Sequence, residues 1–242
     1  MQHWATKVNE ASTPTSTLLL LASFVGLALA TRLAARVLQH RKPGTLFGPR
    51  DSVIKDFVKS ALIVGGIYAC STTGWLFFFD PVPNTDLGLW LTFLPLALVA
   101  VLIQTGAEEL VFRGYLQQQL AARFRSPLAW IVLPSLVFGL MHVAPGASAL
   151  TITMIFGSAT VFGLAAAALT RITGSLGASW GFHFTNNVLA ILVISVDGAI
   201  PGLALYLTPY SIDDSSQYTE LFAANIVAVV FVWYILRRVL RR

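Results

Sequence analysis

Glu108, Glu109 and Arg113 are the residues of this 242-residue chain whose types and spacing are best suited to chemistry. They follow an apolar run from Leu87 to Ile103, and apolar residues resume immediately around them. A charged side chain at the centre of a bilayer costs about 2.5–3.5 kcal/mol even on the milder insertion scale, so such a charge is treated as functional by default. The alternative is a helix that leaves the membrane here with its charges in water.

The two glutamates are predicted to play different parts. Glu109 and Arg113 are spaced i, i+4 in the order that favours an ion pair on one helical face. Glu108 lies about 100° further round the helix and lacks that partner. It is therefore either a general base that faces a wet cavity, or a structural group that packs in an apolar site or faces lipid headgroups.

Two further i, i+4 pairs occur in other apolar stretches, Phe138 with His142 and His183 with Asn187. The second spacing lets two side chains bind one ion or one water, as helical zinc motifs do with two histidines. The structural alternatives are a histidine that caps a helix end and an interhelical His–Asn hydrogen bond. Small residues beside these pairs predict close helix packing, Gly139 in one stretch and the Gly177/Gly181 face in the other.

The composition indicates an integral membrane protein. The chain is 56% hydrophobic and only 11% charged, whereas soluble domains have about 25% charged residues. The net charge of +5 does not come from a basic patch with interleaved aromatics, so nucleic acid is not an expected partner. The one cysteine, Cys70, lies in an apolar run and is predicted to be a packed free thiol.

The apolar runs predict an all-α polytopic membrane helix bundle, with residues 1–242 forming a single integral membrane domain. The predicted spans are 18–38, 57–79, 87–122, 128–142, 147–170, 175–196 and 218–236. An eighth span could lie within 201–208 or in a split of the long third helix, which Pro95 or Gly106 could bend. Residues 197–217 are predicted to form an extramembrane loop that is partly re-entrant in one interpretation.

The distribution of basic residues predicts the orientation. With seven alternating spans and the N-terminus outside, nearly all lysines and arginines fall on the cytoplasmic side, as the positive-inside rule requires. The expected arrangement is a multi-pass membrane protein, N-out and C-in. The predicted cytoplasmic residues are Arg32, Arg36, Arg41, Lys42, Arg50, Lys55, Lys59, Arg123, Arg125, Arg171, Arg237, Arg238, Arg241 and Arg242.

The three pairs together resemble the three motifs of the CPBP family, which comprises the CAAX-prenyl endoproteases and their bacterial homologues and is also called the Abi family. The motifs are written here as Glu108-Glu109-x-x-x-Arg113, Phe138-x-x-x-His142 and His183-x-x-x-Asn187. The resemblance covers residues 94–190, which it implies to be the catalytic motif core. The first two spans and the last carry no motif of this family.

The resemblance implies an intramembrane endopeptidase with its site in a cavity among the motif helices, open toward the cytoplasm. Glu108 is similar to the glutamate that activates the attacking water. His142 and His183 resemble the two site histidines, with Asn187 as the amide partner of the second. Glu109 and Arg113 resemble the structural pair, with Glu109 and Phe138 lining the site. The implied partners are membrane lipid and a protein or peptide substrate that is membrane-associated and possibly lipidated.

Two catalytic mechanisms are compatible with these residues. In one, His142, His183 and one or both of Glu108 and Asn187 hold Zn²⁺, which activates its bound water. An asparagine oxygen is an unusual zinc ligand and counts against this version. In the metal-free version, Glu108 deprotonates water directly, while His183 and Asn187 donate hydrogen bonds to the developing oxyanion.

The predicted spans place the two histidines at different depths. At 1.5 Å per residue, His183 lies about 13 Å from Gly174, and His142 about 22 Å from Pro127. Either the fourth helix is strongly tilted or its start lies deeper than predicted. Two other functions are considered, a non-catalytic membrane scaffold or bacteriocin-immunity protein, and a small proton-coupled transporter. The transporter is disfavoured because the chain shows no inverted repeat.

Overall fold

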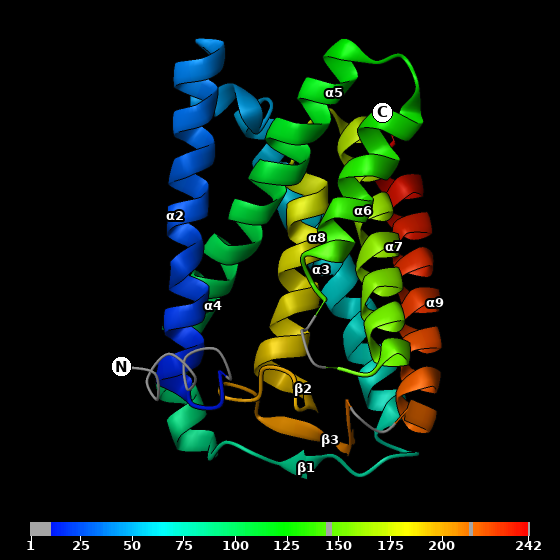
Figure 1. Cartoon of the computed structure of the whole chain (residues 1–242). Coiled ribbons are helices and arrows are strands. Elements are labelled where there is room, and N and C mark those ends of the chain that lie inside the picture. Colours follow the sequence, from blue (N-terminus) through cyan, green and yellow to red (C-terminus); the bar gives the residue numbers. More distant parts are fainter. Residues whose placement is uncertain (1–10, 144–146, 213–214, 242) are drawn as a thin grey trace.

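The computed structural model describes residues 11–143, 147–212 and 215–241, and most of them are helical (Figure 1). Residues 144–146, between the fourth and fifth predicted spans, lie outside the described residues. The α-helices are α2 (Pro14–Gln39), α3 (Arg50–Trp75), α4 (Leu87–Glu109), α5 (Gln117–Arg123), α6 (Leu133–Leu140), α7 (Ala149–Thr173), α8 (Gly177–Asn187) and α9 (Ser215–Leu240). A 3-10 turn covers Pro43–Leu46, and π-helical segments cover Leu110–Leu116, Leu128–Val132 and Val188–Val193.

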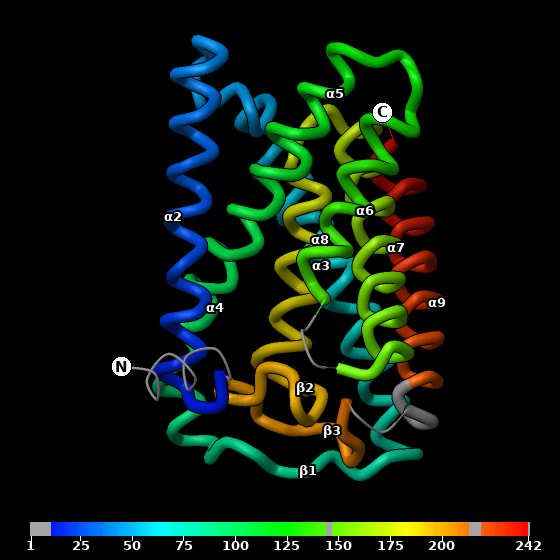
Figure 2. The backbone as a smooth tube through the Cα atoms, in the orientation of Figure 1, coloured from blue at the N-terminus to red at the C-terminus, as the bar shows by residue number. Residues whose placement is uncertain are grey.

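The helices run along one axis and alternate in direction (Figures 1 and 2). α2 begins at the end of the molecule that carries the strands, and α9 ends at the opposite end. Several helix ends away from the strands carry basic residues: Arg41 follows α2, Arg50 begins α3, Arg123 ends α5 and Arg171 lies in the last turn of α7. This arrangement places the basic residues as the positive-inside argument requires.

The described part of the chain contains four helices that are long and apolar enough to cross a membrane, namely Pro14–Gln39, Leu87–Arg123, Ala149–Thr173 and Thr219–Leu240. A shorter apolar helix covers Leu128–Leu140. Large apolar side chains such as Leu33, Leu62 and Val227 are exposed on the outside of the bundle, which is typical of a lipid-facing surface. The protein is therefore an integral membrane protein, while the count of seven to eight spans and the N-out orientation stay predictions.

The third predicted span is one continuous helix, although it is not uniformly α-helical. Pro95 lies inside α4, and the helix passes through Gly106 without a break. The departure from α geometry comes instead at Leu110–Leu116, where the hydrogen bonds become π-helical. Such π segments occur frequently at functional sites, and this one contains Arg113.

Glycines allow the site helices to approach one another closely, as predicted. A Cβ on Gly177 or Gly181 would collide with the backbone of α3, at Val53 and Phe57 respectively. A Cβ on Gly139 would collide with α7 at Thr160. α8 is therefore seated directly on α3, and α6 on α7 (Figure 1).

A small sheet closes the other end of the bundle, and its presence corrects the purely helical prediction. β1 (Val82–Pro83) pairs antiparallel with β3 (Tyr206–Ser211), and β3 pairs in parallel with β2 (Ile194–Asp197). The predicted loop 197–217 thus contains a strand, and the sixth predicted span ends in β2 instead of continuing as a helix to Val196. The β-branched Ile194 and Val196 suit an extended strand.

The prediction that Cys70 is packed is wrong, because its side chain is exposed. An apolar run cannot tell a core-facing from a lipid-facing position, since both exclude water.

Candidate active site

The predicted ion pair of Glu109 and Arg113 lies at the centre of the bundle. Arg113 Nη1 donates to Glu109 Oε1 at 2.9 Å, and the two side chains are 2% and 0% exposed. The second guanidinium nitrogen of Arg113 donates to the carbonyl oxygen of Gly163 on α7 at 3.2 Å. The pair therefore ties the helix of the first motif to α7 in a site without bulk water.

His183 lies between the two glutamates. Its Nδ1 is 2.9 Å from Glu109 Oε1, and its Nε2 is 3.4 Å from Glu108 Oε2. Because the Glu109 oxygen already accepts from Arg113, it acts as an acceptor toward His183 and Nδ1 carries a proton. Nε2 then faces Glu108.

Aromatic rings hold this histidine in place. Phe162 packs at 4.9 Å and Phe138 at 5.9 Å from the His183 ring, measured between ring centroids. The guanidinium of Arg113 lies 4.7 Å from the centroid of Phe138, within the range of a cation–π contact. Phe138 thus touches both the arginine of the first motif and the histidine of the third.

His142 follows the end of α6 and lies one turn beyond Phe138. Its Nδ1 is 2.8 Å from the Phe138 carbonyl oxygen. A carbonyl oxygen only accepts, so Nδ1 carries the proton and Nε2 is free for other partners.

Asn187 is held by side chains that the motif analysis did not single out. Its Nδ2 donates to Gln104 Oε1 at 2.9 Å, and its Oδ1 accepts from Asn186 Nδ2 at 3.3 Å. Tyr68 on α3 donates to Asn186 Oδ1 at 3.1 Å. Gln104 could have been found as a polar residue in an apolar run, one turn before Glu108. The contact with Tyr68 joins positions far apart in the sequence, and no local pattern indicates it.

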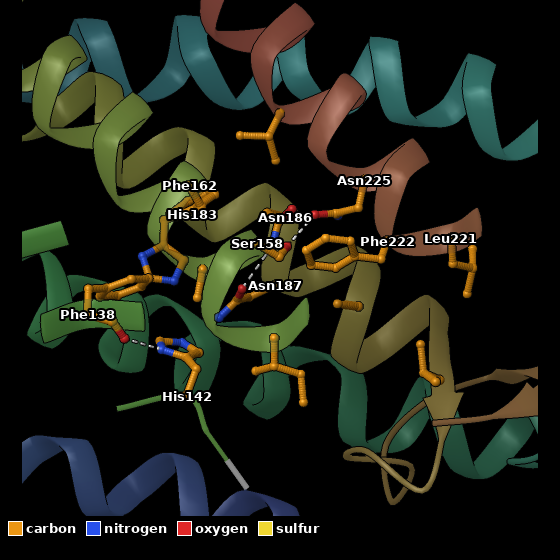
Figure 3. A pocket seen from close by; sticks show the side chains of 15 residues that line it. Phe138, His142, Ser158, Phe162, His183, Asn186, Asn187, Leu221, Phe222 and Asn225 are labelled. Carbon is orange, nitrogen blue, oxygen red and sulfur yellow. Dashed lines mark hydrogen bonds between the residues drawn. The ribbon is translucent and has the colours of Figure 1, made fainter. Parts of the chain in front are cut away.

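Two cavities meet at His142 and Asn187. The first, of about 390 Å³, lies among α6, α7, α8 and α9, and Figure 3 shows the side chains that line it. The second, of about 430 Å³, lies among α2, α4, the end of α6 and β2. His183 lines the first cavity and Glu108 the second, while Val196 of β2 lines both. All four predicted site residues thus line this pair of cavities, and the sheet bounds them at one end.

The predicted zinc ligands do not converge in this arrangement. Within the described residues, no group of three or more His, Cys, Asp or Glu side chains is placed to hold a metal ion. Glu108 and His183 face each other, whereas Asn187 is hydrogen-bonded to Gln104. The donor set as placed therefore does not supply the three convergent protein ligands of a catalytic zinc site, whose fourth position is taken by water.

The fold and the site define a class: a polytopic helical membrane protein with paired carboxylates, histidines and an amide around interior cavities. Residues 90–189 match the family model described as Type II CAAX prenyl endopeptidase Rce1-like. The match confirms, over these residues, the resemblance that the three motifs predict, and it is consistent with a member of the CPBP family.

A relative from Bacillus subtilis (strain 168), described as uncharacterized protein YyaK, is 31% identical over 159 residues. The matched region covers 62% of this chain and 50% of the relative, so the chain spans about half the length of that protein. No solved structure matches the chain.

Proposed function

We propose that this protein is an intramembrane endopeptidase that hydrolyses a peptide bond of a membrane-associated protein or peptide. One observation carries the proposal: Glu108 and Glu109 flank His183 beside cavities that also hold His142 and Asn187. The family description names CAAX prenyl endopeptidases, so lipidated substrates are candidates. The proposed location is a bacterial plasma membrane in the N-out, C-in orientation.

Glu108 is the proposed general base. Its Oε2 is buried and makes no hydrogen bond among the described residues, although His183 Nε2 lies 3.4 Å away. This oxygen can therefore accept a proton from a water molecule in the adjoining cavity. The water oxygen then forms a bond to the scissile carbonyl carbon. When the carbon–nitrogen bond breaks, Glu108 returns the proton to the leaving amine, as a single carboxylate can in acid–base catalysis.

Two other side chains of the site, Asn187 and His183, position Glu108 and stabilise the charge that develops on the carbonyl oxygen. Asn187 uses one N–H for Gln104 and has a second N–H available for the oxyanion. His183 is held by Glu109, which is held in turn by Arg113, so the ring presents Nε2 to Glu108 in one orientation. Donors that are positioned before the reaction begins are worth about 2.7–4 kcal/mol each in known oxyanion holes.

The test compares cells that express the wild type with cells that express Glu108→Gln, and it maps new protein N-termini in their membranes by terminal labelling and mass spectrometry. The variant keeps the shape of the side chain and removes the base, so cleavage should fall by about 10²–10⁴-fold. Glu220→Gln is the matched control, because Glu220 lies outside both cavities. Identical N-termini in the wild type and Glu108→Gln would instead favour the non-catalytic scaffold.

Elemental analysis of the purified wild type beside the purified His142→Ala/His183→Ala double variant tests the zinc prediction. No step of the proposed mechanism uses a metal, so the activity of the protein should not depend on how much zinc it contains. About one zinc per chain, lost in the double variant, would assign these histidines as ligands and replace the mechanism.

A further inference from the structure

A further cavity, of about 440 Å³, lies at the end of the bundle away from the strands (Figure 1). Its walls come from the segment between α2 and α3, from α5, from the last turn of α7 and from the start of α8. It shares no lining residue with the two cavities beside His183, and Arg113 is the one motif residue among the described residues that line it. The proposed function therefore leaves this cavity without a role.

The charged groups around this cavity are cationic. Arg113 and Arg171 line it, and no aspartate or glutamate does so among the described residues. Arg41 borders the cavity, because its guanidinium donates to Gln118 Oε1 at 3.1 Å and to the Thr45 carbonyl oxygen at 3.3 Å, and both of these residues line it. Since Arg113 is already paired inside the bundle, Arg171 and Arg41 supply the positive field that a ligand meets, and this field favours an anion.

The surroundings of Arg171 indicate the depth of the cavity in the membrane. Arg171 is exposed in the last turn of α7, and its guanidinium lies 5.4 Å from the centroid of the Trp130 ring. Tryptophan is enriched at the headgroup level of membranes, and a long arginine side chain reaches the same polar layer. Leu128 begins the π-helical segment that contains Trp130, and its apolar side chain is exposed. We therefore expect the cavity at the depth of lipid phosphates, beside a surface that suits acyl chains.

Gln117 adds a requirement for a hydrogen-bond donor. Its side chain lines the cavity and is only 5% exposed. Its Nε2 donates to the Ala167 carbonyl oxygen at 3.1 Å, whereas its buried Oε1 has no hydrogen-bond partner among the described residues. An amide oxygen only accepts, and a buried acceptor that stays unpaired is costly. A hydroxyl group of a ligand would satisfy this oxygen, so the cavity suits an anion that also carries hydroxyl groups.

We propose that this cavity binds the headgroup of an anionic phospholipid that carries hydroxyl groups, with its phosphate at Arg171 and a hydroxyl donating to Gln117 Oε1. Basic pockets between membrane helices bind anionic headgroups in this way. A soluble phosphate ester with hydroxyl groups shares the same chemistry, but the exposed apolar surface beside Trp130 favours the lipid as the source. The proposal does not rest on the proposed function, because it uses none of the proposed catalytic groups.

The test measures phospholipid binding to the purified full-length wild type in detergent by native mass spectrometry. Three lipids with the same acyl chains are compared. Phosphatidylglycerol carries a charge and hydroxyl groups, phosphatidylethanol carries the same charge without a hydroxyl group, and phosphatidylcholine has no net charge. Affinity should fall about fivefold from the first lipid to the second, the usual net value of one hydrogen bond. It should fall about fivefold again to the third, the usual value of one arginine near an anionic headgroup. Equal affinity for phosphatidylglycerol and either other lipid would overturn the proposal.

Substitutions connect these preferences to the cavity. Arg171→Gln should weaken binding of phosphatidylglycerol about fivefold, and Arg171→Lys should retain most of the binding. Gln117→Met removes the amide, so this variant should bind phosphatidylglycerol and phosphatidylethanol equally. Its unchanged affinity for phosphatidylethanol would show that it is folded. The matched control is Arg125→Gln, at an exposed position that does not line the cavity. An Arg171→Gln effect no larger than that of the control contradicts the assignment.

Soluble glycerol phosphate distinguishes the two sources of the ligand. It should not displace phosphatidylglycerol from the protein, because it brings no acyl chains to the apolar surface. Displacement that depends on Arg171 in the same way would identify the free ester as the ligand and would overturn the lipid assignment. None of these measurements uses hydrolysis, so a failure of the endopeptidase proposal would leave their outcome unchanged.

Discussion

At the scale of single residues, the site depends on buried charges that neutralise one another. Glu109 accepts from both Arg113 and His183 through one oxygen, and its other oxygen has no hydrogen-bond partner among the described residues. The position of the His183 imidazole therefore depends on Glu109. A buried ion pair of this kind contributes little net stability while it is intact, but removal of one partner leaves an uncompensated charge.

We predict that Glu109→Gln destabilises the protein by about 3–5 kcal/mol, because it leaves the Arg113 charge buried without its partner. The double variant Glu109→Gln/Arg113→Met should recover part of this loss, since both charges are then absent. Denaturant unfolding in detergent micelles measures both values. A single variant as stable as the wild type, or a double variant less stable than the single one, contradicts the prediction.

Tyr68 is predicted to orient the amide groups of the site. Its hydroxyl donates to Asn186 Oδ1, which turns the Asn186 Nδ2 toward Asn187. Tyr68→Phe should lower kcat about fivefold, the equivalent of one hydrogen bond, and leave KM nearly unchanged. Tyr234→Phe is the control because Tyr234 is exposed on α9. A rise in KM without a change in kcat would mean that Tyr68 acts on substrate binding instead.

At the scale of elements, glycines and π-helical segments set where the site side chains point. α8 lies against α3 at Gly177 and Gly181, and this contact fixes the height of His183. The π segment Leu110–Leu116 begins directly after Glu109, and the segment Val188–Val193 begins directly after Asn187. A π turn rotates the residues that follow it about the helix axis. Each motif helix can therefore point one face into the site and pack a different face against its neighbours.

Gly181→Ala tests the seating of α8. The added Cβ would meet the Phe57 carbonyl and the Ser60 side chain, and such overpacking costs about 1–3 kcal/mol. We expect lower thermal stability together with lower activity, because His183 moves with the helix. Gly66→Ala on α3 is the matched control, since its Cβ would meet nothing within 4 Å. Equal stability of the two variants would mean that this contact is not tight in the membrane.

At the scale of the whole molecule, the strands and the basic helix ends lie at opposite ends of the bundle (Figure 1). The sheet bounds both cavities through Val196, so access to the site is expected from another direction. The resemblance implies a cavity open toward the cytoplasm, and this direction stays a prediction.

Thiol labelling tests the predicted orientation, because Cys70 is the one cysteine of the chain. In a Cys70→Ser background, Asp80→Cys should react with a membrane-impermeant maleimide in intact bacterial cells. Ser126→Cys should react only after the membrane is permeabilised, since Ser126 lies between α5 and the Leu128–Val132 segment. The opposite labelling pattern would reverse the predicted topology.

The sequence by itself determined the class of protein, the motif helices and the Glu109–Arg113 pair. These features are local: apolar runs exclude charge from lipid, i, i+4 spacing places two side chains on one face, and Gly139, Gly177 and Gly181 mark close approach. Only the tertiary structure decided that Glu108 and Glu109 contact opposite nitrogens of His183, that Tyr68 reaches Asn186, and that residues 206–211 form a strand. Helical periodicity shows which residues share a face, but it cannot show which helices meet, because that depends on packing between positions far apart in the chain.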